Sequence, residues 1–279
     1  SKMNINIRGN LYDFSSPKVM GILNITPDSF YDGGKFKDDQ KIKNHINKMI
    51  NDGMDILDIG GYSSRPGASE VSISEELERV IPTLIFIKKN FKNLIISIDT
   101  FRSEVAKASL IEGADIINDI SAGVFDSKMM DVISKFNCPY ILMHMKGNPR
   151  NMQNSPKYKH TAVEIIQFLA ERIKVARKKN IVDIIVDPGF GFGKTVEHNF
   201  EILNNLENFK ALDAPLLTGF SRKSMIFKTL KTTSDEALNG TSSVNTIALM
   251  KGANILRVHD VKEAKECIIL YEKTINSLF

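Results

Sequence analysis

The chain has 279 residues, of which 42% are hydrophobic and 25% charged, and its formal net charge is +4. This composition is ordinary for one large or two small globular domains, and so mild a charge argues against nucleic acid and suits an anionic small molecule. No apolar run approaches the ~20 residues of a membrane span, and two cysteines without a CxxC motif argue against a disulfide framework or a zinc site. The first residues also lack the apolar stretch of a secretion signal, so we expect a cytoplasmic protein without a membrane partner.

The first predicted element is a β-hairpin in the segment MNINIRGNLYDF, residues 3–14. Short strand-like runs lie on either side of Gly9 and Asn10, where we place the turn. In a closed barrel such a hairpin could cover the bottom.

Eight short apolar runs follow, separated by longer amphipathic stretches with the period of helices. The runs are residues 19–23, 56–59, 94–98, 116–117, 140–143, 184–186, 216–218 and 255–258. They are continuous rather than alternating, which is typical of parallel strands buried on both faces. Eight strand–helix units in a chain of this length predict an α/β fold, the (β/α)8 TIM barrel, as a single domain over residues 1–279. An open doubly wound sheet is the structural alternative.

Polar side chains lie in or just after every predicted strand. In chain order they are Asn24, Asp58, Asp99, Asn118 with Asp119, His144, Asp187, Lys223, and Arg257 with His259. One strand-ending carboxylate is most often a helix cap, but capping does not explain eight strands with an amide, carboxylate, imidazole or cation at this place. In a barrel these strand ends meet at one mouth, where active sites lie, so the pattern predicts a functional site there.

The segment DPGFGFGKT, residues 187–195, nearly matches the phosphate-binding pattern GxxxxGK[ST]. Its first position is Pro188 rather than Gly, and the sequence holds no acidic partner strand of the nucleotide-hydrolase type. We therefore interpret the glycines as backbone that can approach a flat ligand, with Phe190 or Phe192 as a wall.

Eight motifs, taken together and in this order, resemble one known family. They are GILNITPDSFYDGG, DIGGYSSRPGA, SIDTFR, INDISAG, LMHMKGNPRNMQ, VDPGFGFGK, GFSRKS and RVHDV, and they span residues 20 to 261. The family that they resemble is dihydropteroate synthase. The resemblance implies a TIM barrel that condenses 6-hydroxymethyl-7,8-dihydropterin diphosphate with p-aminobenzoate in folate biosynthesis, with Mg2+ as cofactor. It also implies inhibition by sulfonamides and a homodimer built from late helices within residues 234–250 and 261–277.

The resemblance further implies roles for individual residues. The pterin would contact Asp99, Asn118, Met143, Asp187 and Lys223. The diphosphate would contact Asn24, Ser64, Arg257 and His259, with Asn24 also as the metal ligand. The p-aminobenzoate would contact Phe30, Arg65, Pro66, Phe192 and Ser221. The catalytic set would be Asp32, Asp99, Asp187, Lys223, Arg257 and His259.

Two segments after the early strands complete this hypothesis. Residues 27–36 look like the family's closing loop, which would bring Asp32 to the reacting centre. In the second loop, Tyr62 stands where the family commonly has Glu, and Ser64 stands where it commonly has Thr. Ser64 keeps a hydroxyl group.

Two alternative functions share part of these motifs. A barrel that passes the methyl group of methyltetrahydrofolate to a corrinoid protein would share Asp99, Asn118 and Asp187, but it has no need of NITPDSF, SSRPG or RVH. A non-catalytic pterin-binding module would be marked by loss of residues such as Asn24 or Lys223, and both are present. Release of diphosphate from the two substrates would separate the three functions.

Overall fold

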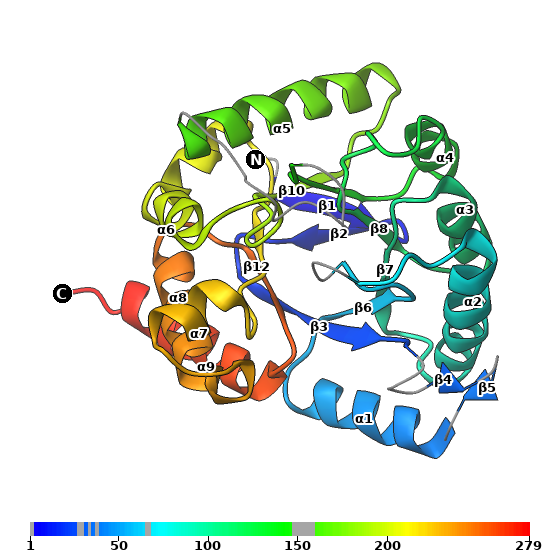
Figure 1. Ribbon diagram of the computed structural model, residues 1–279, viewed down its shortest axis with the longest axis horizontal. Helices are drawn as coiled ribbons and strands as arrows, with labels where there is room; N and C mark the ends of the chain where they lie inside the picture. The colour runs from blue at the N-terminus through cyan, green and yellow to red at the C-terminus, as the bar shows by residue number, and fades with distance from the viewer. Residues whose placement is uncertain (1–2, 27–30, 33–34, 37–38, 65–67, 147–159) are drawn as a thin grey trace.

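The computed structural model describes residues 3–26, 31–32, 35–36, 39–64, 68–146 and 160–279, with backbone alone for 31–32 and 35–36. Within them, eight parallel strands form a barrel inside a ring of helices (Figure 1). The strands are β3 (Lys18–Asn24), β6 (Ile56–Gly60), β7 (Ile95–Asp99), β8 (Ile116–Asp119), β9 (Tyr140–Met143), β10 (Ile184–Asp187), β11 (Leu217–Thr218) and β12 (Ile255–Val258).

The strands pair in the order β10–β9–β8–β7–β6–β3–β12–β11. A parallel bridge between Val186 and Leu216 joins the two ends of this order and closes the ring. The amide of Val186 donates to the carbonyl of Pro215 at 2.9 Å across the same junction. The predicted TIM barrel is confirmed, and the open doubly wound sheet is wrong because the two outermost strands meet.

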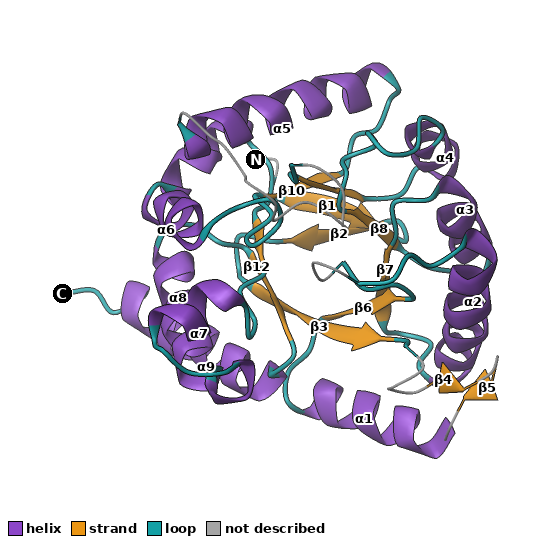
Figure 2. Ribbon diagram, viewed as in Figure 1, coloured by secondary structure: helices purple, strands orange, loops and turns teal. Residues whose placement is uncertain are grey.

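Helices cover the outside of the barrel, as the purple ring around the orange strands shows (Figure 2). They are α1 (Asp39–Asn51), α2 (Ile73–Asn90), α3 (Ser103–Ile111), α4 (Met129–Phe136), α5 (Thr161–Lys178), α6 (Val196–Asn204), α7 (Ser224–Thr229), α8 (Leu238–Met250) and α9 (Val261–Ile275), with 3-10 turns η1 (Leu206–Leu212) and η2 (Ser234–Glu236). Outward-facing strand residues such as Leu57 and Ile59 belong to the same apolar core as Val80 and Leu84 of α2. Burial of this shared surface stabilises the helix ring on the barrel.

The predicted N-terminal hairpin is also present. Strands β1 (Asn4–Ile7) and β2 (Asn10–Asp13) pair antiparallel, and Arg8 and Gly9 between them have φ of 54° and 80°. The turn therefore lies at Arg8–Gly9, one residue before the position that the sequence suggested, because two successive positive φ values suit a two-residue hairpin turn.

The hairpin closes the bottom of the barrel. Ile5, Ile7 and Phe14 are buried in one apolar cluster with the inward-facing residues at the beginnings of the barrel strands. Arg8 reaches across to Asp115, with Nη2 2.9 Å from Oδ2. The opposite end of the barrel is therefore the one left to receive a ligand.

The short strands β4 (Tyr31–Asp32) and β5 (Lys35–Phe36) form a small antiparallel pair outside the barrel sheet. Among the described residues, no helix has both the length and the apolar character that crossing a membrane requires.

Candidate active site

The inside of the barrel changes from apolar to polar along each strand. Alternate residues of a strand face the same side, so Ile56 and Asp58 of β6 both point inward, as do Ile255 and Arg257 of β12. The isoleucines belong to the bottom cluster that the hairpin covers. The carboxylate and the guanidinium lie one layer higher, toward the mouth, and they are in contact.

Five side chains form a connected chain of polar contacts across this upper layer. Asn118 Nδ2 donates to Asp58 Oδ2 at 3.1 Å, and Arg257 Nε donates to the same oxygen at 2.7 Å. Arg257 Nη2 lies 3.4 Å from Asp99 Oδ2, and the Tyr62 hydroxyl donates to Asp99 Oδ1 at 3.0 Å. We call this set the mouth network. It links strands β6, β7, β8 and β12, which are far apart in the sequence.

Two oxygens of the mouth network have no described partner. Asp58 Oδ1 and Asn118 Oδ1 are both buried, and neither accepts a hydrogen bond from a described residue. Because a carboxylate only accepts, Asn118 must turn its NH2 group toward Asp58 and its carbonyl oxygen away. Buried acceptors of this kind are costly unless a donor reaches them. The site therefore suits a ligand that carries N–H groups.

Burial sets the electrostatics of Asp99. This residue is 8% exposed. Burial, together with the neighbouring charge of Asp58, raises the pKa of Asp99 to about 7, while Arg257 and the Tyr62 hydroxyl act in the opposite direction. A carboxylate with a pKa near neutrality responds strongly to any change in these neighbours.

A second group of polar residues lies beside the mouth network, at the ends of β10 and β11. Asp187 is buried, which raises its pKa, and its Oδ1 accepts from the amide of Gly189 at 2.8 Å. Lys223 Nζ donates to the carbonyl of Phe190 at 2.7 Å and lies 5.0 Å from the centre of the Phe192 ring. Burial lowers the pKa of Lys223 to about 8, and Asp187 opposes this shift. The pair can offer both an acceptor and a donor to one flat ligand.

The two groups meet at Gly219. A Cβ atom on this residue would lie 3.6 Å from Lys223 Nζ and 3.9 Å from Arg257 Cβ. Lys223 and Arg257 therefore flank the same small residue, and the Lys223–Asp187 pair and the mouth network border one space.

Ser221 and His259 form a third group. The Ser221 hydroxyl lies 2.8 Å from His259 Nδ1 and accepts from the His259 amide at 3.1 Å. Ser221 is buried, whereas His259 is exposed. The imidazole can therefore reach a ligand from the edge of the mouth while Ser221 fixes its orientation.

The glycine-rich loop after β10 is held by a buried lysine. Lys194 is 2% exposed, and its Nζ donates to the carbonyls of Gly189 at 2.7 Å, Phe192 at 2.8 Å and His144 at 3.3 Å. A Cβ atom at Gly189 would lie 1.9 Å from the carbonyl oxygen of His144, and its φ is 74°. Lys194 therefore uses its ammonium group to hold the backbone of this loop, and only glycine fits at position 189, where the loop packs against the backbone of His144.

Met143 and Phe192 contribute an apolar surface near these groups. Met143 is 3% exposed and packs in a small cluster with Tyr62, Ile120 and Met145, against which Phe192 also lies. The cluster is separate from the apolar cluster at the bottom of the barrel. An apolar surface beside two polar groups is the usual composition of a small-molecule site.

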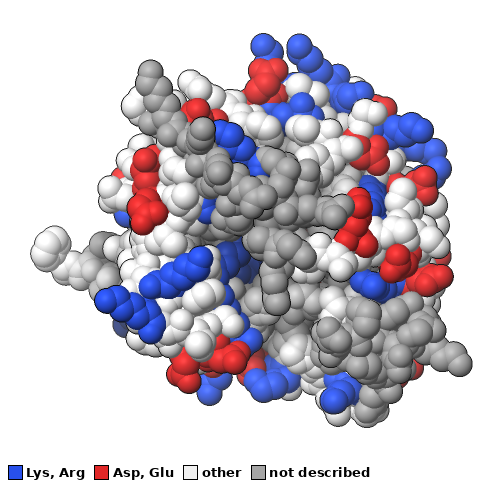
Figure 3. All heavy atoms as spheres, viewed as in Figure 1, with Lys and Arg blue, Asp and Glu red and all other residues white. Residues whose placement is uncertain are grey.

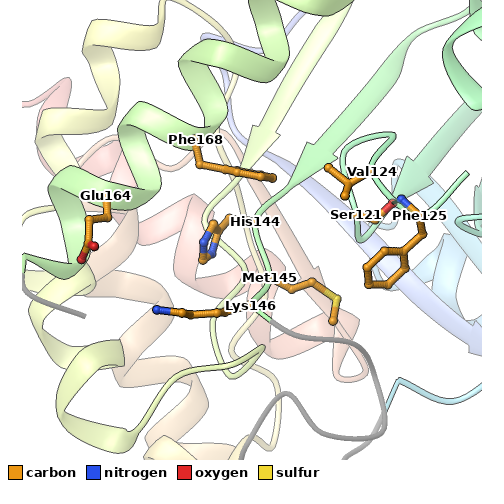
Figure 4. Close-up of a pocket in the computed structure, with 8 residues that line it drawn as sticks. All are labelled: Ser121, Val124, Phe125, His144, Met145, Lys146, Glu164 and Phe168. Carbon is orange, nitrogen blue, oxygen red and sulfur yellow. Dashed lines mark hydrogen bonds between the residues drawn. The ribbon is translucent and has the colours of Figure 1, made fainter. Parts of the chain in front are cut away.

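His144 does not join these groups. It follows Met143, so its side chain faces the other side of the strand, where it meets the ring of Phe168 edge-on with centroids 5.0 Å apart. It lines a separate pocket of about 370 Å³ between the ends of β8 and β9 and helix α5 (Figure 4). Burial keeps the pKa of His144 far below its ordinary value, so it is neutral.

The structure places the remaining predicted residues as follows. Asn24 is exposed at the end of β3, where its backbone pairs with Gly60, and Ser64 is half-buried. Phe30, Arg65 and Pro66 lie outside the described residues, and Asp32 is described only by its backbone in β4. Around the rim of the face in Figure 3, basic and acidic side chains are interspersed.

The sequence-based prediction gave no role to three residues of the site, Asp58, Tyr62 and Lys194, although Asp58 was among the polar residues predicted at the strand ends. Asp58 had a usable signal, because a carboxylate inside the apolar run ILDIG must find a partner. Tyr62 stood out as a departure from the resembled pattern, but nothing in the sequence indicated its contact with Asp99. Lys194 was visible only as part of the glycine-rich segment.

Comparisons with known proteins agree with this geometry. A model of the pterin binding enzyme family matches residues 20–259. The dihydropteroate synthase of Escherichia coli is 43% identical over 277 residues, which are 99% of this chain and 98% of that protein. A Yersinia pestis dihydropteroate synthase solved with a sulfonamide drug complex superposes with a TM-score of 0.92 at 40% identity, covering 99% of this chain and 100% of that one. A Xanthomonas albilineans dihydropteroate synthase in complex with 7,8-dihydropteroate gives a TM-score of 0.86 at 33% identity, covering 99% of this chain and 100% of that one.

Proposed function

The chain belongs to the dihydropteroate synthase family of pterin-binding enzymes, and from this premise we propose how its residues share the work of the reaction. The reaction joins 6-hydroxymethyl-7,8-dihydropterin diphosphate to p-aminobenzoate and releases 7,8-dihydropteroate and diphosphate, a step of folate biosynthesis. The observation that carries the assignment of residues is the mouth network, with two buried acceptor oxygens beside the Asp187–Lys223 pair.

We propose that Asp187, Asn118 and Lys223 hold the pterin. The amino-pyrimidinone edge of a pterin presents adjacent N–H donors, which a buried carboxylate such as Asp187 can accept together. Asn118 has turned one N–H toward Asp58, so its carbonyl oxygen is the group left to accept from the ring. Lys223 can donate to the ring carbonyl and N5, and Met143 with Phe192 would support the flat face of the ring.

Charge drives the chemical step in this proposal. The bond between the methylene carbon and the diphosphate oxygen breaks, and its electron pair leaves with the diphosphate. The methylene cation that remains is conjugated with the pterin, and Asp99 lies at the mouth as a negative group that can stabilise it. Arg257, His259 and Ser64 would bind the leaving diphosphate.

The second half of the step needs no strong base. The nitrogen lone pair of p-aminobenzoate attacks the methylene carbon and forms the new C–N bond. The nitrogen then carries one proton too many, and this proton passes to water or diphosphate. An aryl amine is already neutral at pH 7, which explains why a nucleophile–base pair of the hydrolase type is not required. Asp32, from the segment after the first strand, would add a negative group near the cation.

Asn24 is the residue that would hold Mg2+. Its amide oxygen is a hard, neutral donor at the exposed end of β3, and such a donor suits an ion that keeps several waters and binds mainly through phosphate oxygens. The described residues contain no group of three or more His, Cys, Asp or Glu side chains that could cage a metal. When bound, the ion would neutralise charge on the leaving diphosphate.

We expect diphosphate release to require Mg2+ and both substrates. Treatment with EDTA should lower the rate by about tenfold or more, because charge on the leaving group is then less well neutralised, and added Mg2+ should restore it. Release of diphosphate can be followed with a coupled phosphate assay, with EDTA plus excess Mg2+ as the control. A full rate in EDTA would contradict the metal role of Asn24, and no release with both substrates would contradict the assigned reaction.

We propose that p-aminobenzoate binds between Phe192 and Ser221, together with Phe30, Arg65 and Pro66 from the two early loops. Sulfonamides share the amine, the ring and the anionic end of this substrate. A Yersinia pestis relative has been solved with a sulfonamide drug complex, and a Xanthomonas albilineans relative has been solved with 4-aminobenzoic acid.

A sulfonamide should therefore compete with p-aminobenzoate in this enzyme. Raising p-aminobenzoate should restore the rate, since both compounds occupy one pocket, whereas raising the pterin substrate should not. Initial rates over a grid of inhibitor and substrate concentrations test this, with the pterin series as the control. Inhibition that p-aminobenzoate does not relieve would show that the pocket is not shared.

We further propose that residues 1–279 form one domain that acts as a cytoplasmic homodimer. Two observations support the dimer: α8 and α9 pack against each other, and both carry exposed apolar side chains. Ile247 and Met250 of α8 are 44% and 60% exposed, and Ile269 and Leu270 of α9 are 54% and 68% exposed. Sedimentation of the purified protein tests the dimer, and a monomer at micromolar concentration would contradict it.

A further inference from the structure

Tyr62 lies in the loop after β6, and its hydroxyl group points at Asp99, the neighbouring member of the mouth network. The hydroxyl donates to Asp99 Oδ1 at 3.0 Å, and the side chain is 7% exposed. Its ring meets the ring of Phe101 edge-on, with centroids 5.3 Å apart. Just before it, the carbonyl of Gly61 accepts from Arg79 Nη1 at 3.0 Å. Ring packing and an anchored backbone therefore fix the direction of the hydroxyl.

This contact means that Asp99 is held at both of its oxygens. Tyr62 occupies Oδ1, and Arg257 Nη2 approaches Oδ2 at 3.4 Å. Burial, first of all, raises the pKa of Tyr62 well above its ordinary value, so the hydroxyl keeps its proton and remains a donor. A neutral donor orients a carboxylate without adding a charge to a site that must stabilise a cation.

We propose that Tyr62 is a positioning residue that acts through Asp99, holding the carboxylate of Asp99 as an oriented acceptor beside the developing positive charge. The proposal rests on the role assigned above to Asp99. Tyr62 itself touches no reacting atom. Its contribution therefore belongs to the transition state, where an oriented negative group matters most.

The groups that face Asp99 give the proposal a pH signature. They are Asp58 on β6, Glu76 on α2, Arg257 on β12 and Tyr62 itself. Asp58 and Glu76 raise the pKa of Asp99, whereas Arg257 and the Tyr62 hydroxyl lower it. Removing the hydroxyl must then raise the pKa of Asp99. The acid limb of the rate profile should move to higher pH, since Asp99 gains its proton earlier as the pH falls.

The variant Tyr62→Phe removes the hydroxyl and keeps the ring. At pH 7 we expect kcat to fall about tenfold, because the free energy of one hydrogen bond to a charged group corresponds to a rate factor of about that size. KM for the pterin substrate should change little, because the interaction acts in the transition state. The acid limb of the kcat profile should shift upward in pH. These are measured on purified enzyme by initial rates between pH 5 and 9, roughly the range around the pKa of Asp99.

Tyr140→Phe is a matched control. The Tyr140 hydroxyl also donates to a buried carboxylate, Asp119 Oδ2, at 2.5 Å, but among the described residues neither Tyr140 nor Asp119 forms a hydrogen bond with Asp99. This variant should lose stability in a thermal melt while its pH profile stays at that of the parent. A Tyr62→Phe enzyme with an unchanged profile and kcat, or one that loses activity equally at every pH, would overturn the proposal.

A variant of Asp99 separates this proposal from the function on which it rests. In an Asp99→Asn background, Tyr62→Phe should cost no further rate, since Tyr62 then has no carboxylate to position. If Asp99→Asn alone keeps the parent rate, the role of Asp99 fails. If Asp99→Asn is impaired but Tyr62→Phe lowers the rate by the same factor with and without it, only the role of Tyr62 fails. If Tyr62→Phe folds poorly, a second variant, Phe101→Leu, loosens the packing of the Tyr62 ring without removing the hydroxyl. It should shift the acid limb of the kcat profile upward in the same way, and an unshifted profile would contradict the proposal.

Discussion

Replacing Asp187 with alanine should abolish pterin binding while leaving the barrel folded. The carboxylate is buried at the end of β10, and the pterin edge can give it two charge-assisted hydrogen bonds. These are worth roughly 1.5–3 kcal/mol each, so the affinity for a pterin ligand should fall by on the order of 10²–10⁴-fold. Calorimetric titration with a pterin measures this loss, and a thermal melt checks the fold.

The competing explanation is that Asp187 only shapes the turn in which its Oδ1 accepts from the Gly189 amide. Asp187→Asn separates the two, because an amide oxygen can keep the turn but cannot supply the charge. Asp126→Ala is the matched control: Asp126 also accepts from backbone amides, those of Ser103 and Lys128, and it forms no hydrogen bond with a described residue of the mouth network. It should cost ~1 kcal/mol of stability and no affinity. If the Asp187→Ala protein has a lower melting temperature but binds pterin with an affinity within a few-fold of the parent, Asp187 does not bind the pterin.

Replacing Arg257 with methionine should cost both stability and catalysis. Its guanidinium contacts Asp58 at 2.7 Å and Asp99 at 3.4 Å, so its loss leaves two buried carboxylates without their cation. Removing one partner of a buried ion pair costs about 3–5 kcal/mol of unfolding free energy. The diphosphate also loses a cationic contact, and kcat/KM should fall by on the order of 10²–10³-fold. Urea denaturation and initial rates measure the two effects.

Arg8→Met offers a control at the other end of the barrel. Arg8 pairs with the buried carboxylate of Asp115 beneath the bottom cluster, with Nη2 2.9 Å from Oδ2. Its loss should lower stability while KM and kcat stay near those of the parent. If Arg257→Met matched Arg8→Met, losing stability but not activity, Arg257 would be a structural residue and not part of the diphosphate site.

The barrel and the bottom hairpin could be predicted because each depends on local patterns. Continuous apolar runs identify strands buried on both faces, and their number and spacing point to eight units. These apolar runs do not indicate which of the polar residues at the strand ends face the same side of the barrel wall. His144 directly follows Met143, and the two-residue period of a strand turns it toward Phe168 and away from the mouth.

Contacts between distant segments were the part that the sequence could not supply. The resemblance carries over residues that match a motif, so it assigned Asp99 and Arg257 but was silent on Asp58, which joins Asn118 to Arg257. Tyr62 reaches Asp99 from the loop that follows the neighbouring strand β6. Such a contact depends on the register between β6 and β7, which pairs Gly60 with Asp99 and which no local pattern encodes.

The closure of the ring also bears on the order in which the chain can fold during synthesis. Strand β3 pairs with β12, so residues 18–21 wait for residues 255–258, and Asn254 Nδ2 donates to the carbonyl of Phe14 across 240 residues of sequence. Until β12 leaves the ribosome, one edge of β3 has no neighbour, and open strand edges are where nascent chains associate wrongly. The hairpin cannot pack against the complete bottom cluster until β12 has been synthesised, because Ile255 of β12 belongs to that cluster. The hairpin and β3 are thus synthesised before the rest of the barrel but are among the last segments to reach their final contacts.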